Sequence, residues 1–251
     1  MIAFPLGCYI DWILDRSAWL LDSSFHEQMD FSPLTAVVRM FGPMVRQRVR
    51  IRFCKRGDLR FIGHRDLVRT MERLFRRSDL RLEMSQGFHP KPKMSFPSAL
   101  AVGIEGLDEV MELELAQRYT PDTMSSLLSR HSVPGLTFES VKVIPEGAKK
   151  AKVENLTYET HIPEDRRAQV KNQINAIIDM QTCPIQRTNK RSVDLMESLD
   201  SLKLADGMLS MRFRVRAQAS AGPRDVLAVL GLDDLEKSGM CLKRTKVELS
   251  T

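Results

Sequence analysis

The chain has 251 residues, of which 43% are hydrophobic and 28% are charged, as in an ordinary soluble globular protein. This length is enough for one large domain or for two domains of about 100 residues each. The cysteines are far apart and form no CxxC motif, which argues against disulfides, an iron-sulfur cluster or another metal site: Cys8, Cys54, Cys183 and Cys241.

Residues 1–45 differ from the rest of the chain. Their apolar stretch is interrupted by Asp11, Asp15 and Arg16 and follows no basic region, so it fits neither a signal peptide nor a membrane span. We expect a poorly ordered N-terminal leader outside the fold of a cytoplasmic protein. An amphipathic docking helix is the alternative.

Regular patterns begin after residue 45. Alternating apolar residues predict strands at 49–53, 80–84, 110–115 and 136–143, with Glu112 and Glu114 facing outward. A helix is predicted to begin at Gly63-His64, because apolar residues follow at helical spacing: Leu67, Val68, Met71, Leu74 and Phe75. Thr120-Pro121-Asp122 predicts the start of a second helix that ends near His131.

The same order of elements recurs after a polar linker at 147–155. The second half has strands at 156–162, 209–215 and 242–249, a helix after Pro163 and a short helix from Pro223, while Asp206-Gly207 predicts a hairpin turn. The expected fold is therefore α+β, with two tandem ferredoxin-like (βαββαβ) units at 46–146 and 156–251. Each unit would have an antiparallel sheet with two helices on one face.

Positive charge is concentrated in one region. Residues 46–93 carry 15 Lys and Arg against 5 Asp and Glu, a balance of +10 in a chain whose total is +6. Four arginines form a stripe on the first predicted helix: Arg65, Arg69, Arg73 and Arg76. Such a surface suits a polyanion, because each phosphate that it neutralises releases counterions. Pairing with Glu72 and simple solvation of the helix face are the alternative.

A Pro-rich loop follows the second predicted strand. Residues 85–97 contain three prolines, two aromatics and the lysines Lys91 and Lys93. Because proline fixes φ and lacks an N–H, we expect a stiff, extended segment without ladder hydrogen bonds. Phe88 or His89 could stack on a base. Alternatively, the loop is a structural crossover in which Phe88 and Phe96 fill the core.

The segment from Arg50 to Gly106 resembles the radical-SAM-linked protein family, a bacterial domain of unknown function found fused to or encoded beside radical SAM proteins. The likeness covers residues 46 to 249, with weaker matches at Tyr158, Arg187, Lys190, Arg191 and Asp194. The strongest matches are His64, Asp66, Leu67, Arg69, Glu72, Arg73, Arg76, Ser85, Gly87, Phe88, Pro90, Pro92, Lys93, Ser95 and Gly103. His89 stands where members commonly have Asn.

The resemblance implies a radical SAM partner that would carry the iron-sulfur cluster and S-adenosylmethionine, with no cofactor in this chain. It implies no established reaction. His64 and Asp66 are the candidates for acid/base catalysis, but residues two apart at a helix start do not face each other, so a cap and a dipole role are the alternatives. The other histidines have no companions at metal-ligand spacing.

We therefore expect an RNA-binding accessory protein, for tRNA or rRNA, that acts with a radical SAM enzyme and has no membrane segment. The predicted contacts on the first half are Arg65, Arg69, Arg73, Arg76, Phe88, His89, Lys91 and Lys93. Arg50 and Arg52 would join them. A second patch would contain Arg187, Lys190 and Arg191, with Arg212, Arg214, Arg216, Arg224 and Arg244 beside it. The alternatives are an RNA-acting enzyme resembling pseudouridine synthases or endonucleases, and a purely protein-binding module.

Overall fold

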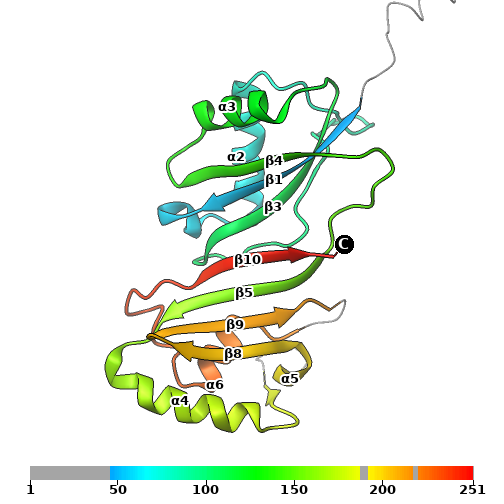
Figure 1. Ribbon diagram of the computed structural model, residues 1–251. Helices are drawn as coiled ribbons and strands as arrows, with labels where there is room; N and C mark the ends of the chain where they lie inside the picture. The colour runs from blue at the N-terminus through cyan, green and yellow to red at the C-terminus, as the bar shows by residue number, and fades with distance from the viewer. Residues whose placement is uncertain (1–45, 187–191, 217–219, 251) are drawn as a thin grey trace, which may run out of the picture. The chain divides into compact units, whose positions relative to one another are not determined.

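The structure is a computed structural model that describes residues 46–186, 192–216 and 220–250. One sheet contains the strands β1 (Gln47–Lys55), β2 (Met94–Ser95), β3 (Glu105–Leu115), β4 (Leu136–Ile144), β5 (Val153–His161), β8 (Leu199–Ala205), β9 (Met208–Arg214) and β10 (Lys243–Leu249). Seven of them follow the order β4-β1-β3-β10-β5-β9-β8, and β2 pairs with β3 (Figure 1). The pairing is mostly antiparallel, so the predicted α+β class is confirmed.

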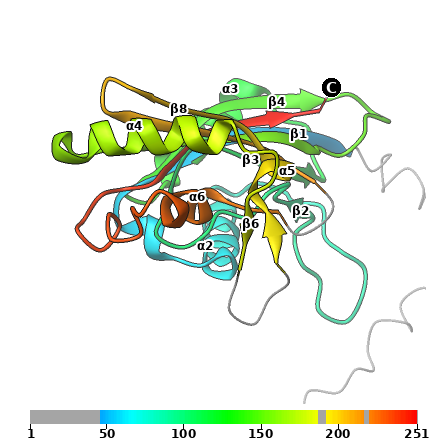
Figure 2. The same ribbon diagram turned by 90° about the horizontal axis from the view of Figure 1, so that it is seen from below.

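The described residues form five α-helices and one 3-10 helix. The helices are α2 (His64–Arg77), α3 (Pro121–His131), α4 (Glu164–Ile178), α5 (Leu195–Ser198), α6 (Pro223–Val229) and the 3-10 helix η1 (Gly57–Phe61). A separate two-stranded sheet joins β6 (Pro184–Ile185) and β7 (Val193–Asp194). Helices α2 and α6 and strand β6 lie on the same side of the large sheet (Figure 2). No helix in the described part of the chain is both long and apolar enough to cross a bilayer.

The core follows from the predicted periodicities. Val49, Ile51 and Phe53 alternate along β1 and are fully buried, and the apolar face of α2 packs on the same cluster through Met71 and Leu74. A second cluster fills the space between β5, β8 and β9 on one side and α4 and α6 on the other. Each half of the chain therefore buries its helices against its own strands.

Two local signals are confirmed. The Thr120 side chain caps α3 by accepting a hydrogen bond of 3.2 Å from the N–H of Thr123. Asp206 and Gly207 both have positive φ, 50° and 76°, as the two-residue turn of the β8–β9 hairpin requires.

The two halves share one sheet, which the sequence did not indicate. The last strand of the chain, β10, pairs antiparallel with β5 and also parallel with β3, where Lys243 lies opposite Glu105 and Arg244 opposite Gly106. The prediction of two separate antiparallel sheets is therefore wrong on this point. Strand β10 joins them because it offers each of its edges to a different half.

The predicted strand at 80–84 and the Pro-rich loop form an irregular hairpin, whose tip we call the 85–91 loop. The N–H of Ser85 donates to the Lys91 carbonyl at 2.8 Å, and the N–H of Lys93 donates to the Glu83 carbonyl at 2.8 Å. The expectation of no ladder hydrogen bonds is therefore wrong. Pro90 and Pro92 alternate with the lysines, so the donors that the pairing needs are still present.

Candidate nucleic-acid interface

The outer face of α2 carries the predicted arginine stripe. At 100° per residue the four arginines fall within an arc of about 80° opposite the buried residues of the helix, and all four are exposed: Arg65, Arg69, Arg73 and Arg76. Arg69 forms an ion pair of 3.3 Å with Asp66, but both side chains are more than half exposed, so this pair is weak. The other three arginines have no acidic partner within 4 Å among the described residues. Their charge is available to a ligand.

The 85–91 loop presents an aromatic ring to solvent. Gly87 has φ of +128°, a conformation that L side chains rarely adopt, and the next residue, Phe88, is fully exposed at 103%. His89 is also exposed. Phe96, in contrast, packs edge-on against Phe53 at 6.2 Å. The alternative in which both phenylalanines fill the core is therefore wrong for Phe88.

Helix α2 and the loop meet at a pocket of about 510 Å³, which we call the α2 pocket. Arg76 reaches it from the helix, Lys91 from the hairpin, and Arg81 from the turn between them. Two of the predicted phosphate contacts are thus brought together. The acidic residues Glu72 and Asp79 also line the pocket.

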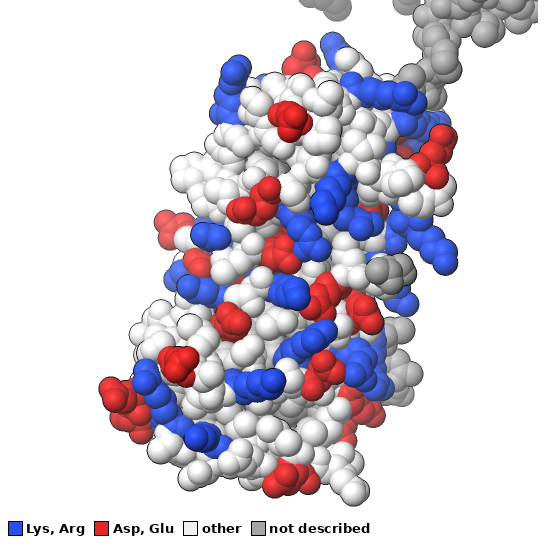
Figure 3. Space-filling view, in the orientation of Figure 1, with Lys and Arg blue, Asp and Glu red and all other residues white. Residues whose placement is uncertain are grey.

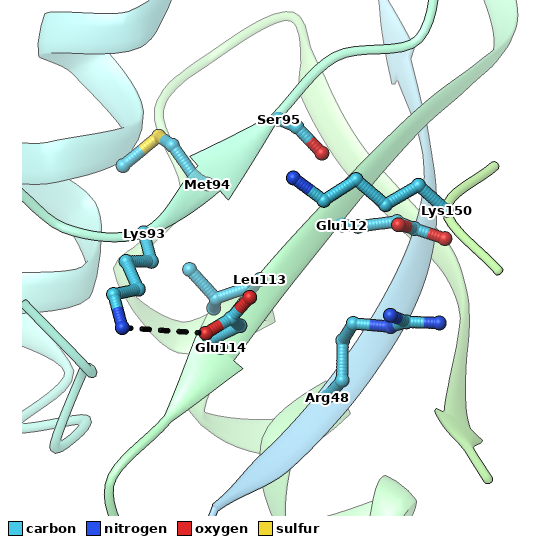
Figure 4. Close-up of a pocket in the computed structure, with 8 residues that line it drawn as sticks. All are labelled: Arg48, Lys93, Met94, Ser95, Glu112, Leu113, Glu114 and Lys150. Carbon is cyan, nitrogen blue, oxygen red and sulfur yellow. Dashed lines mark ion pairs between the residues drawn. The ribbon is translucent and has the colours of Figure 1, made fainter. Parts of the chain in front are cut away.

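Lys93 belongs to a different environment. Its Nζ lies 3.2 Å from a carboxylate oxygen of Glu83 and 3.7 Å from one of Glu114, and it lines a smaller pocket with Arg48 and Lys150 (Figure 4). Its charge is therefore balanced by acidic neighbours. The prediction of Lys93 as a free phosphate contact has no support from this geometry.

Arg50 and Arg52 do not join the α2 surface. Residues alternate across a strand, so these side chains leave β1 on the opposite face from Val49 and Ile51, which pack under α2. Arg50 pairs with Glu112 at 2.9 Å, and Arg52 pairs with Asp108. Glu112 is only 3% exposed, which corrects the expectation that it faces solvent. Basic and acidic side chains are interspersed on this face of the molecule (Figure 3).

The predicted second patch is not assembled. Arg187, Lys190 and Arg191 lie outside the described residues. Four of the other arginines form ion pairs with carboxylates: Arg212 and Arg214 with Asp200, Arg224 with Glu236, and Arg244 with Glu109. Arg216 is exposed. The pairs with Asp200 join β8 and β9, where ion pairs across strands stabilise a sheet. All four arginines therefore have little charge left for a ligand.

His64 and Asp66 contact different partners. Gly63 is the N-cap of α2, so the capping role expected for His64 is wrong. The His64 ring packs edge-on against Phe96 with centroids 5.3 Å apart, and Asp66 pairs with Arg69. Within the described residues, no three His, Cys, Asp or Glu side chains gather where they could hold a metal ion.

Asp79 follows the C-terminal end of helix α2, at a position where glycine is the usual residue. The N–H groups of Asp79 and Leu80 donate to the carbonyls of Arg76 and Phe75, both at 3.3 Å, which is the Schellman pattern, and Asp79 has φ of 51°. We expect Asp79→Gly to raise the free energy of unfolding by about 0.5–1 kcal/mol, because glycine has no Cβ to clash in this conformation. Urea unfolding measures this change in the free energy of unfolding. Asp79→Asn is the control, with little change expected, and a less stable Asp79→Gly variant would contradict the explanation.

A buried cluster of charged residues lies between β3 and β10, and it was not predicted from the sequence. Arg244 and Glu109 are 1% and 5% exposed, and Arg244 Nε donates to a Glu109 oxygen at 2.7 Å. Lys55 is buried beside them and donates to the Ile62 carbonyl at 2.9 Å. Burial lowers the pKa of Lys55, as does the nearby positive charge of Arg244, while Glu109 opposes the shift. Since the arginine and the glutamate are 135 positions apart, no local pattern could have paired them.

These features define an α+β protein with an exposed basic helix and an aromatic loop. The chain belongs to the family described as "Uncharacterized protein conserved in bacteria (DUF2344)", whose model matches residues 48–224. No curated protein matches the sequence. Among solved structures, it is similar to "Crystal Structure of an Unknown Protein from Galdieria sulphuraria", at 12% identity over 82% of this chain and 100% of that chain, with a TM-score of 0.26. A TM-score of this size supports no inference about fold or function.

Proposed function

We propose that this chain is a cytoplasmic RNA-binding accessory protein, for tRNA or rRNA, that acts with a radical SAM enzyme. The observation that carries the proposal is the exposed face of α2, where Arg65, Arg73 and Arg76 have no acidic partner within 4 Å among the described residues. An arginine that pairs with no carboxylate keeps its full charge for phosphate.

The position of Phe88 favours RNA over a compact polyanion. Its ring is fully exposed at the tip of a short hairpin, on the loop that adjoins the basic helix at the α2 pocket. Aromatic rings beside a positively charged surface bind unpaired bases by stacking, and RNA loops and ends offer such bases. A loop already held by its own hydrogen bonds loses little entropy on binding.

The radical SAM partner is proposed from the family resemblance described above. The iron-sulfur cluster and S-adenosylmethionine would belong to that partner. We also interpret the strand orders β4-β1-β3 and β10-β5-β9-β8 as two ferredoxin-like units that share a sheet. Helices α2 and α3 lie between the strands of the first unit, and α4 and α6, with the short α5, between those of the second.

Binding of the purified chain to total tRNA at several salt concentrations tests the RNA part of the proposal. We expect the logarithm of the binding constant to fall linearly with the logarithm of salt concentration, as counterion release requires. Absence of binding at low salt would reject this function. Co-purification of a radical SAM protein that survives nuclease treatment, without any RNA affinity, would favour a protein-binding module instead.

Phe88→Ala tests the stacking contact. Since the ring contributes nothing to the core, the variant should fold like the wild type. We expect its affinity for single-stranded RNA to fall by about 5- to 150-fold, from about 1–3 kcal/mol for each stacked base. Phe88→Trp is the matched control and should retain binding. Equal affinity of the alanine variant and the wild type would exclude a contact between Phe88 and a base.

A further inference from the structure

The α2 pocket has the size and composition of a small-molecule site. Its volume of about 510 Å³ falls within the range of roughly 300–1,000 Å³ that is usual for ligand pockets. Leucine, methionine and proline side chains supply an apolar lining: Leu80, Leu82, Met84, Pro90 and Pro92. Such a lining suits the flat, weakly polar face of a nucleobase.

The charged residues that line the pocket, all in the described part of the chain, form no ion pairs with one another. Arg76, Arg81 and Lys91 provide three cations, and no ion pair within 4 Å involves any of them among the described residues. The same holds for the side chains of Glu72 and Asp79. A site with free cations and free carboxylates can bind a ligand that has both an anionic group and hydrogen-bond donors.

A nucleotide has both an anionic group and hydrogen-bond donors. Its phosphate accepts hydrogen bonds from arginine and lysine, while an ionised carboxylate can only accept and so requires an N–H group on the base. Adenine, cytosine and guanine carry an exocyclic amino group that donates, whereas the corresponding positions of uracil are carbonyl acceptors. Uracil has one donor, its N3–H, but this group lies between two carbonyl oxygens that a carboxylate repels. Two carboxylates in one pocket therefore favour the amino-bearing bases over uracil.

Asp79 supports a role for the carboxylates. It keeps a left-handed conformation at a position where glycine would be less strained, and it is one of the residues that line the pocket. Residues held in rare conformations persist where the structure compensates for them, and they cluster at binding sites. A carboxylate retained there at a cost in stability is consistent with a contact to a ligand.

We propose that the α2 pocket receives one unstacked nucleotide of a single-stranded RNA segment, with its phosphate on Arg76 and Lys91 and the amino edge of its base on Glu72 and Asp79. The inference rests on the proposed function and narrows it to single-stranded RNA with amino-bearing bases. A base inside a duplex is stacked and paired, so it cannot enter.

Blocking the pocket tests the inference. Ala116 is exposed and lines the pocket, so the indole of Ala116→Trp should fill the space. The neighbouring residue, Gln117, is exposed but does not line the pocket, so Gln117→Trp is the matched control. Fluorescence anisotropy would measure binding to 10-nucleotide oligo-A, oligo-C and oligo-U and to an RNA duplex. We expect the wild type and Gln117→Trp to bind oligo-A and oligo-C about 10-fold more tightly than oligo-U. Ala116→Trp should remove this preference and leave duplex binding unchanged.

The outcomes separate this inference from the function on which it rests. Binding of all RNAs with equal affinity by the wild type, or an unchanged preference in Ala116→Trp, would overturn the pocket while the RNA function stands. Absence of binding to any RNA would overturn both. Asp79→Asn provides a second variant that keeps the left-handed backbone, since asparagine also adopts it. It should reduce the preference for oligo-A and oligo-C at least threefold, and an unchanged preference would exclude Asp79 as the acceptor.

Discussion

Replacing the four arginines on the outer face of α2 with alanine should weaken the binding of tRNA by about 100-fold at 0.1 M salt: Arg65, Arg69, Arg73 and Arg76. The slope of log K against log salt should also become shallower, by about 0.7 for each phosphate of a single strand that the variant no longer neutralises, or roughly 3 for all four. Alanine favours helix, and none of the four side chains is buried, so the fold should be retained. Anisotropy titrations over a range of salt concentrations measure both quantities.

The control removes the same charge elsewhere. Four exposed lysines lie at or near the connection between β4 and β5: Lys142, Lys149, Lys150 and Lys152. Their replacement by alanine gives a variant of equal net charge, and we expect it to bind nearly as the wild type does. Equal losses of affinity in the two variants would mean that binding depends on net charge alone, and the α2 face would not be a specific surface.

The arginine stripe could be predicted from the sequence because a helix fixes the relation between its own residues. Once Leu67, Met71 and Leu74 are assigned to the core, the period of 3.6 places Arg69 and Arg73 on the outer face without further information. The capped start of α3 at Thr120 and the turn at Asp206 are local in the same sense. Sequence patterns that span only a few residues were enough to predict the arginine stripe, the helix cap and the turn.

Features that depend on distant parts of the chain could not be predicted. The strand period shows that Arg50 and Arg52 oppose Val49, but only the sheet supplies the carboxylates of β3 that neutralise them. A count of charges along the sequence treats both arginines as free. The α2 pocket likewise depends on how the hairpin of residues 82–93 folds back toward α2, which the two prolines alone did not determine.

The buried pair of Glu109 and Arg244 joins β3 to β10, where the two halves of the chain meet. Arg244 also donates to the Ser98 hydroxyl at 3.0 Å and to the Ala99 carbonyl at 3.2 Å, so nearly all of its guanidinium is engaged. The glutamate leaves little room, since a Cβ on Gly106 would lie 2.5 Å from its Cγ. A buried ion pair contributes little net stability when intact, but the removal of one partner leaves an unpaired charge that costs about 3–5 kcal/mol.

We therefore expect Glu109→Gln and Arg244→Met each to lower the free energy of unfolding by about 3–5 kcal/mol, with the larger decrease for Glu109→Gln. That variant removes the carboxylate whose charge acts on both Lys55 and Arg244, so two buried cations remain, whereas Arg244→Met leaves the charge of Lys55 to oppose that of Glu109. The double variant Glu109→Leu with Arg244→Met should recover at least about 2 kcal/mol relative to the worse single variant, because it leaves no unpaired member of the pair.

Urea unfolding measures these differences, and the exposed pair of Arg166 and Asp234 provides the control. Its atoms are as close, at 2.7 Å, but both side chains are more than a third exposed, so Arg166→Met should change the midpoint of unfolding only slightly. If Arg244→Met and Arg166→Met had equal effects, burial would not be what makes the pair important. A double variant as unstable as the sum of its parts would show that packing around the two side chains, and not their charge, holds β3 beside β10.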